Sequence, residues 1–266
     1  MQTDGLRRIR ASNPSPMTLD GTQTFVVGDR QTVVIDPGPD DPAHLDAIEH
    51  ALSGSAVQAI LLTHIHPDHA AGAEALAARV GAPIWRGREA DDRWPEVRAD
   101  HWLSDGDIIT TDRGLLRPVG TPGHSPDHHV FAWSADPAAG GPIVFVGDLL
   151  MGEGDTTLVA APEGDLALYL ASLDRLKELA ANRYLPAHGP PIDDPATAVR
   201  RYRAHREQRI EQVAAIQADA GPIDSSEMVS LIYGESLNPS LAAAAEGSIR
   251  AILAYLKRHD DLHTPR

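Results

Sequence analysis

The chain has 266 residues, 42% of them hydrophobic, and a formal net charge of −15. This length and apolar content disfavour a disordered chain and suffice for one large domain with its own core plus a smaller appendage. There is no cysteine, which excludes disulfides and thiolate metal sites. Any metal would therefore be held by imidazole and carboxylate groups.

Short apolar or β-branched segments, each bounded by Gly, Asp or Pro, predict strands through the first 195 residues. Apolar residues at three- and four-residue intervals predict helices between them, at Ala43–Leu52, His69–Val80 and Leu166–Ala181. This alternation indicates an α/β fold in which helices cover sheets. The predicted strands are Thr24–Val27, Thr32–Ile35, Ala59–Ile65, Pro83–Trp85, His129–Trp133 and Ile143–Val146.

The proline-rich stretch Pro186–Pro195 cannot continue a helix, so we predict a domain boundary near residue 195. The two predicted domains are residues 1–195 and residues 196–266. The second is predicted to be all-helical, with helices at Ala196–Ala218, Asp224–Tyr233 and Pro239–Arg258.

The excess negative charge lies in the first predicted domain. Residues 1–195 contain 14 Lys and Arg against 29 Asp and Glu, whereas residues 196–266 contain nine of each. The negative electrostatic field of such a surface disfavours non-specific nucleic-acid binding without excluding RNA. No stretch approaches the roughly 18 apolar residues of a membrane span, and the first residues lack a signal-peptide pattern. We therefore expect a soluble cytoplasmic protein with no membrane partner.

Four metal-capable side chains, His64, His66, Asp68 and His69, fall within six residues directly after an apolar strand. A strand end lets His64 and His66 project from one side, because the side-chain period is two. The following turn carries Asp68 and His69 toward a neighbouring position. The pattern therefore indicates a site for two metals.

Three further segments place a metal-ligand type in a Gly or Pro turn or at the end of an apolar strand. They contain His124 in Thr121–His124, Asp148 in Val146–Asp148, and His188 in Leu185–Gly189. Each segment is weak by itself, since a Gly-Asp turn or a single His near Pro is usually structural. Because the three segments follow the first motif in this order, together they are strong evidence for a metal site.

With these segments the sequence resembles the metallo-β-lactamase superfamily over roughly residues 10–190, which implies an αββα sandwich with the metal site at the sheet edges. The resemblance also implies that Asp36 orients the ligands. Position by position, it implies that His64, His66 and His124 hold one metal, that Asp68, His69 and His188 hold the second, and that Asp148 bridges them.

Three segments, Asn13–Thr22, Gly147–Gly154 and Tyr202–Arg206, resemble the β-lactamase-like protein 2 group, and this resemblance covers nearly the whole chain. It implies a small winged-helix-like C-terminal domain. The animal members of the group are associated with single-strand endoribonuclease activity, and related branches hydrolyse thioesters. The chain departs from the group at Gln23, where Asn is usual, and lacks the His-Glu-Ala-Thr signature of tRNA-processing relatives.

The ligand types suit two Zn²⁺ ions, although Fe or Mn would also be accepted. We predict hydrolysis by a metal-bound hydroxide, with Asp68 and Asp148 as the catalytic carboxylates. The acidic surface and the missing RNA-processing signatures favour a small-molecule thioester or ester. The alternative is cleavage of single-stranded RNA by the same centre. A non-enzymatic hypothesis, in which the C-terminal domain binds nucleic acid or protein, is disfavoured because that domain is charge-balanced.

Arg206 falls in the middle of the apolar face of the first C-terminal helix. Two interpretations are open: a salt bridge to the acidic domain, which we favour, or a contact with a substrate phosphate or carboxylate, joined by His205. Near His124, the neighbours Asp127 and His128 are predicted to support the site rather than to react. The sequence leaves the oligomeric state open.

Overall fold

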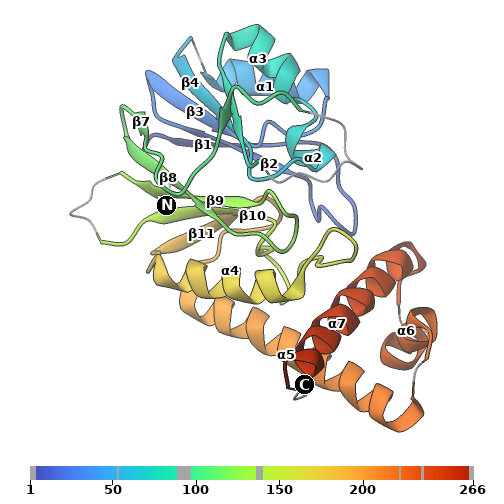
Figure 1. Ribbon diagram of the computed structural model, residues 1–266. Helices are drawn as coiled ribbons and strands as arrows, with labels where there is room; N and C mark the ends of the chain where they lie inside the picture. Colours follow the sequence, from blue (N-terminus) through green and yellow to red (C-terminus); the bar gives the residue numbers. More distant parts are fainter. Residues whose placement is uncertain are drawn as a thin grey trace.

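The computed structural model describes residues 4–52, 54–88, 97–135, 140–221, 223–234 and 237–263. Two sheets form its centre (Figure 1). The first has the order β1-β2-β3-β4-β5-β6 and the second β11-β10-β9-β8-β7. The first comprises β1 (Leu6–Arg10), β2 (Gln23–Val27), β3 (Gln31–Ile35), β4 (Ala56–Leu61), β5 (Ile84–Arg86) and β6 (His101–Trp102). The second comprises β7 (Ile109–Thr111), β8 (Gly114–Gly120), β9 (His129–Ser134), β10 (Ile143–Gly147) and β11 (Arg183–Pro186).

Alternation along the strands divides the buried side chains between three layers of core. In β2, Phe25 and Val27 point into the layer between the sheets, where they meet Phe131 and Phe145, whereas Val26 points to the opposite face. Full burial of each such side chain contributes roughly 1.5–3 kcal/mol. Because both faces of both sheets are apolar, helices cover the outside and produce the predicted αββα sandwich.

Helices α1 (Pro42–Leu52) and α3 (Ala73–Val80) cover the first sheet, and α4 (Leu166–Glu178) covers the second (Figure 1). The single helix predicted over His69–Val80 is wrong. The chain forms a short α2 (Pro67–Ala70), then a break, then α3. The break lies at Gly72, whose backbone nitrogen donates to Gly38 O at 2.9 Å, and a Cβ there would stand 2.9 Å from Pro39 O.

Five strands escaped the sequence prediction: β1, β6, β7, β8 and β11. Four of them are edge strands; β1, β6 and β7 are only partly buried and so show a weaker apolar pattern, whereas β11 is mostly buried but only four residues long. The fifth, β8, lies inside its sheet but contains Arg117 and Pro118, which interrupt the apolar pattern. Local sequence does not reveal such strands, because their pairing partners stabilise them.

After Pro195 the described residues form only helices, with no strand that could make a wing. They are α5 (Pro195–Ala220), α6 (Ser225–Tyr233), the 3₁₀ helix η2 (Pro239–Leu241) and α7 (Ala242–His263). The C-terminal part is therefore helical, as predicted, but a winged-helix domain is not shown. Among the described helices, none is long and apolar enough to cross a membrane.

The strands position the functional residues by ending at one common edge. The parallel strands β3 and β4 end there in the first sheet, and β8, β10 and β11 end there in the second. Backbone hydrogen bonds join the sheets at this edge: Gln23 N donates to Ala187 O and His129 N to Thr63 O, both at 2.8 Å. Residues just beyond these strand ends are therefore held together.

Candidate metal centre

The seven side chains that the sequence singled out as metal ligands converge at this edge. His64 and His66 follow β4, and Asp68 and His69 lie in α2. The second sheet supplies the other three from the loops after its strands, namely His124 after β8, Asp148 after β10 and His188 after β11. Elements far apart in sequence thus supply one cluster of donor atoms.

The donor atoms group into triads, each with its three atoms within 4.8 Å of one another. The triads are His64, His66 and His124; His64, His69 and Asp148; and Asp68, His69 and His188. The Asp148 carboxylate lies between the two sides, because its Oδ1 is 3.2 Å from His188 Nε2 and its Oδ2 is 3.7 Å from His124 Nε2. This arrangement fits two cations that share Asp148.

Several of these atoms are buried without a hydrogen-bond partner. They include Nε2 of His64, His69 and His188, and Oδ1 of Asp148. Buried polar atoms normally have partners. Asp148 Oδ1 lies 3.2 Å from His188 Nε2 and 3.4 Å from His69 Nε2. His64 Nε2 faces the same point, but no carboxylate of the described residues lies within 4.0 Å of it, which requires an explanation. A bound cation supplies one, since neutral imidazole and carboxylate are its usual protein ligands. The residues fit a dinuclear metal site.

The other nitrogen of each histidine is held by the protein, which fixes the ring orientation and the tautomer that presents a lone pair to the cluster whenever the ring is neutral. The Nδ1 of His124 donates to Leu158 O at 2.7 Å. The remaining partners are the Thr63 hydroxyl for His64 Nδ1 at 3.0 Å, Asp36 Oδ2 for His69 Nδ1 at 2.9 Å, Gly21 O for His188 Nδ1 at 3.5 Å, and Glu163 Oε1 for His66 Nε2 at 2.9 Å.

Asp36 connects two of these histidines. Its Oδ1 accepts from the Thr63 backbone nitrogen at 2.7 Å, and its Oδ2 accepts from the Thr63 hydroxyl at 2.7 Å and from His69 Nδ1 at 2.9 Å. The Thr63 hydroxyl donates to Asp36, so it is free to accept from His64. Asp36 therefore orients both rings without facing the cluster.

His64 and His124 of the first triad are neutral. Burial lowers the pKa of His64 well below its usual value, and the neighbouring rings of His69, His66 and His124 lower it further. Burial also lowers the pKa of His124 to about 4. Two ligand nitrogens are therefore ready to bind a cation at neutral pH without first losing a proton.

The other side of the cluster is an ion-paired group. Burial acts to lower the pKa of His69 and His188, but the carboxylates outweigh it: Asp68 and Asp148 raise the pKa of His69 well above its usual value, and Asp148 raises that of His188 to about 9. Burial acts to raise the pKa of Asp68, but His69 and His188 outweigh it and lower the value to about 2. Here a metal must displace protons from the rings.

A model of the metallo-beta-lactamase superfamily matches residues 17–188, a range that contains every residue of the cluster. The chain belongs to the metallo-beta-lactamase superfamily. It is 29% identical to a beta-lactamase-like protein 2 homolog of Caenorhabditis elegans, over 99% of this chain and 88% of that protein. It is 32% identical to the Drosophila melanogaster homolog, over 91% of this chain and 85% of that protein. Family and cluster together make the protein a metal-dependent hydrolase.

Solved structures share this metallo-beta-lactamase fold. The crystal structure of a family protein from Thermus thermophilus superposes with a TM-score of 0.79 at 22% identity, over 97% of this chain and 95% of that one. A second structure, of a protein in a di-iron-bound form, has a TM-score of 0.52 at 28% identity, over 68% of this chain and 92% of that one.

The structure places His128 and Asp127 beside the metallo-beta-lactamase cluster rather than in it. Burial lowers the pKa of His128 well below its usual value, so the ring is neutral; its Nε2 accepts from the Asp148 backbone nitrogen at 3.2 Å. Gly147 makes this approach possible, since a Cβ there would lie 2.7 Å from that Nε2. Asp127 accepts from Ser125 Oγ at 2.8 Å, and burial raises its pKa to about 6.

Two contacts of the cluster were missed by the sequence analysis. Glu163 holds His66 by the contact given above, and Thr22 Oγ1 donates to Asp68 Oδ2 at 3.4 Å. Glu163 lies 97 positions from its partner and Thr22 lies 46 positions from its partner. A single Glu or Thr in a loop carries no recognisable pattern, so no local signal identifies either one.

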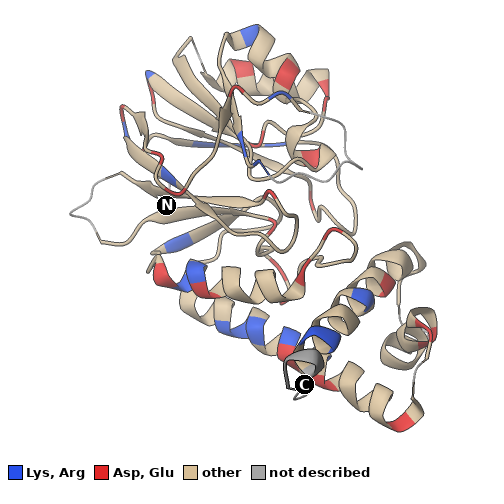
Figure 2. Ribbon diagram, in the orientation of Figure 1, with Lys and Arg blue, Asp and Glu red and all other residues tan. Residues whose placement is uncertain are grey.

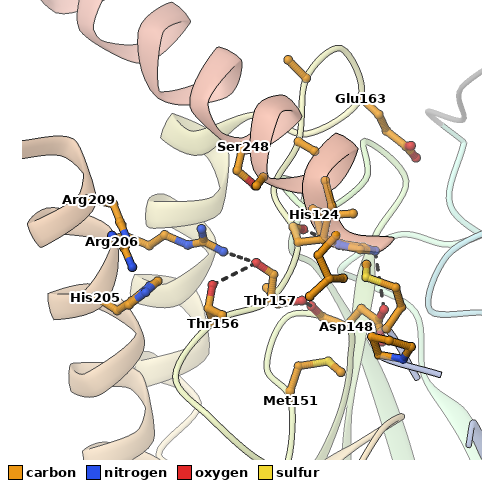
Figure 3. Close-up of a pocket in the computed structure, with 18 of the residues that line it drawn as sticks. His124, Asp148, Met151, Thr156, Thr157, Glu163, His205, Arg206, Arg209 and Ser248 are labelled. Carbon is orange, nitrogen blue, oxygen red and sulfur yellow. Dashed lines mark hydrogen bonds and ion pairs between the residues drawn. The ribbon is translucent and has the colours of Figure 1, made fainter. Parts of the chain in front are cut away.

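A cavity of about 540 Å³ opens at the cluster and extends between the C-terminal helices (Figure 3). His66, Asp68, His124 and Asp148 line one part of it. Apart from the cluster residues the lining is mostly apolar, and α7 with the segment before it supplies one part of it. The apolar residues of that part are Leu237, Leu241, Ala244, Ala245 and Ile252.

Arg206 and His205 also line this cavity. The favoured interpretation of Arg206 as an interdomain salt bridge is wrong, because no carboxylate among the described residues pairs with it. Arg206 Nη2 instead donates to Thr157 O, and the guanidinium lies 5.2 Å from the ring centre of Tyr169. Thr157 Oγ1 in turn donates to Asp148 O at 2.8 Å (Figure 3). Arg206 thus braces the loop that carries Asp148.

Proposed function

We propose that the protein hydrolyses a thioester or ester of a small molecule with an apolar acyl group. The observation that carries this proposal is the cavity, which joins the metal cluster directly to apolar side chains of α7. Its volume lies within the range of about 300–1,000 Å³ that is usual for small-ligand pockets. An acyl chain bound there would bring its carbonyl carbon to the cluster.

The bound cations would supply a water molecule ionised near neutral pH and a Lewis acid for the carbonyl oxygen. The protein's own groups prepare that chemistry. Asp68 is the more exposed of the two carboxylates, with 29% of its side chain accessible, and it lines the cavity as an anion. We propose that Asp68 orients the attacking water by accepting one of its hydrogens, while Asp148 holds the two halves of the cluster together.

For the metals we propose two Zn²⁺ ions, held by the residues that the sequence indicated. The donor set of imidazoles and carboxylates supports zinc, but it is equally a set that Fe or Mn accepts. The similar protein crystallised in a di-iron-bound form makes iron the alternative to test first. Elemental analysis of protein purified without chelator distinguishes these metals.

Cleavage of single-stranded RNA by the same centre is the second candidate. It is favoured by three nitrogen-bearing side chains in the cavity wall, His205, Arg206 and Arg209, which could meet phosphate oxygens. The net charge of −15 argues against it, since a polyanion gains little affinity from an acidic surface.

A parallel assay tests the two candidates. Metal-loaded protein is presented with a panel of acyl thioesters of increasing chain length and with a labelled unstructured RNA, and Asp68→Ala serves as the blank. We expect thioester hydrolysis that improves with chain length and is lost in the variant. RNA cleavage without thioester hydrolysis would reverse the ranking.

A further inference from the structure

Helix α5 lines the cavity with basic side chains, whereas α7 lines it mostly with apolar ones. His205, Arg206 and Arg209 form this α5 wall, and Figure 3 shows them on the side of the cavity away from His124 and Asp148. Figure 2 shows the Lys and Arg positions of α5 grouped along the middle of the helix. A ligand at the metal cluster would therefore extend toward cationic groups.

Two of the three groups are not saturated by the protein. Arg206 is only 4% exposed, and its Nε has no hydrogen-bond partner; the described residues offer it a carbonyl and an aromatic ring but no anion. The Nδ1 of His205 is buried and also lacks a partner. A buried cation without a counter-charge is unfavourable, so an anion brought by a ligand would be stabilised here.

Arg209 extends the same wall. It is partly buried, with its Nη1 donating to Gln212 Oε1 at 2.7 Å and its guanidinium 4.9 Å from the ring centre of Tyr233. Neither contact neutralises its charge.

The other arginines of α5 are occupied elsewhere. Arg200 donates to Thr197 Oγ1, Arg201 to Gly154 O, and Arg203 to Asp174. None of these three lines the cavity. The cationic wall is thus a local feature of the cavity.

We propose that the substrate carries an anionic group, a phosphate or a carboxylate, which binds to Arg206 and Arg209 with His205 as a further donor. The inference rests on the proposed function and narrows it: the substrate is an amphipathic anion whose apolar part lies along α7 and whose scissile carbonyl lies at the metal cluster. Arginine suits this role because its planar fork donates two parallel hydrogen bonds to an oxyanion.

The cavity favours a small amphipathic anion over an RNA strand. Leu241, Ala244 and Ala245 of η2 and α7 also line the cavity, and these apolar side chains offer a nucleotide chain no polar partners. The basic residues of α5 outside the cavity are already paired, so no continuous basic track follows the helix.

Matched substrates test the proposal on either side of the scissile bond. The first pair is the hexanoyl and adipoyl thioesters of N-acetylcysteamine, in which the anion is on the acyl side. The second is hexanoyl-pantetheine with and without its 4′-phosphate, in which the anion is on the thiol side. In at least one of the two pairs we expect the anionic member to have a kcat/KM about tenfold higher, mainly because its KM is lower.

Variants separate anion binding from the bracing role of Arg206. Arg206→Met and Arg209→Met should each reduce the preference for the anionic member to less than about threefold, while Arg200→Met, on the same helix but outside the cavity, retains it. A purely structural loss would lower kcat/KM equally for both members of a pair. The proposal would be overturned if the unaltered protein had equal kcat/KM for the two members of both pairs. It would also be overturned if both cavity variants kept the full preference for the anionic member.

A binding measurement separates this proposal from the hydrolase proposal. Calorimetry with hexyl phosphate and with hexanoate needs no turnover, and we expect binding of at least one to weaken about tenfold in Arg209→Met. If this holds while no thioester is hydrolysed, the anion site stands and the proposed reaction fails. Binding that is insensitive to Arg209 would place the anion at the metals and contradict the anion site. RNA cleavage that weakens in both variants, without thioester turnover, would assign the arginines to a polymer and also contradict it.

Discussion

Each histidine of the cluster divides its two ring nitrogens between the metal site and the protein. The partners of the outer nitrogens are of three kinds: carboxylates at Asp36 and Glu163, a hydroxyl at Thr63, and backbone carbonyls at Leu158 and Gly21. These partners set the tautomer and the ring orientation, so metal affinity depends on residues that never touch a metal.

Asp36→Asn tests this dependence. The amide cannot accept from the Thr63 nitrogen, the Thr63 hydroxyl and His69 Nδ1 at once, so the two histidine rings lose their fixed orientation. We expect metal affinity to fall about 10–100-fold, measured by competition with a fluorescent chelator. Asp112→Asn is the control, because Asp112 likewise accepts several backbone hydrogen bonds but lies at the opposite end of β8. Equal affinity in the two variants would contradict the role of Asp36.

Metal binding should release protons. The pKa of His188 is raised to about 9 and that of His69 is also raised, so at pH 7 both rings are protonated before a metal binds. Because only the neutral ring binds a cation, affinity should fall as the pH decreases below the raised pKa. Calorimetry in buffers of different ionisation enthalpy should show about two protons per chain released from the rings at pH 7, and up to about one more from the metal-bound water. A release near zero would show that the rings are neutral.

The residues that the sequence could reveal are those with a local pattern. His64 to His69 carry a dense motif, and His124, Asp148 and His188 each follow an apolar strand or a Gly or Pro turn; this order indicated a shared site, and the resemblance to the superfamily assigned the ligands to two metals. Glu163 and Thr22 could not be found in this way, because long-range folding alone brings each to its partner.

At the scale of elements, α4 and α5 hold the loop that follows β10 and carries Asp148. The Tyr169 hydroxyl of α4 donates to Leu149 O at 2.9 Å. The Tyr202 hydroxyl of α5 accepts from Met151 N at 2.8 Å and donates to Met151 O at 3.0 Å. With the Arg206 contact to Thr157, these bonds fix the loop at several points, so the C-terminal helices support the metal cluster as well as the cavity.

Tyr202→Phe measures the contribution of this anchorage. The substitution leaves the ring packed but leaves both backbone groups of Met151 without their partner in a buried position. We expect the free energy of unfolding to fall by about 1–3 kcal/mol, measured by denaturant titration. Tyr255→Phe is the control, since its hydroxyl has no hydrogen bond within the described part of the chain, and it should change stability by less than about 0.5 kcal/mol. Similar losses in both would contradict the anchoring role.

The helical period placed Val199, Tyr202, Arg206, Ile210, Val213, Ile216 and Gln217 on one face of α5; the first three and Val213 are buried, Ile210 and Ile216 are partly buried, and Gln217 is exposed. The periodic pattern revealed which side chains face inward but not what they meet there. The winged-helix expectation came from resemblance to a group, and helical periodicity could not test it. The break between α2 and α3 was equally hidden, because it depends on the approach of another loop to Gly72.

At the scale of the whole molecule, the cluster joins the two sheets, and bound metals should therefore stabilise the fold. A ligand that binds only the folded state at about 1,000 times its dissociation constant contributes about 4 kcal/mol. For a chain of this size we expect chelation to lower the Tm by roughly 10 °C, measured by calorimetry. Asp148→Asn weakens the shared ligand, so chelation should lower the Tm of this variant by less. An unchanged Tm would contradict the link between the cluster and the fold.

The central claim is that two cations share Asp148 at the edge where both sheets end. Anomalous X-ray scattering from crystals of the metal-loaded full chain tests it most directly. We expect two peaks about 3.5–4 Å apart, as in other two-metal hydrolytic sites, one beside His64, His66 and His124 and the other beside Asp68, His69 and His188. A single peak, or peaks away from these residues, would contradict the account.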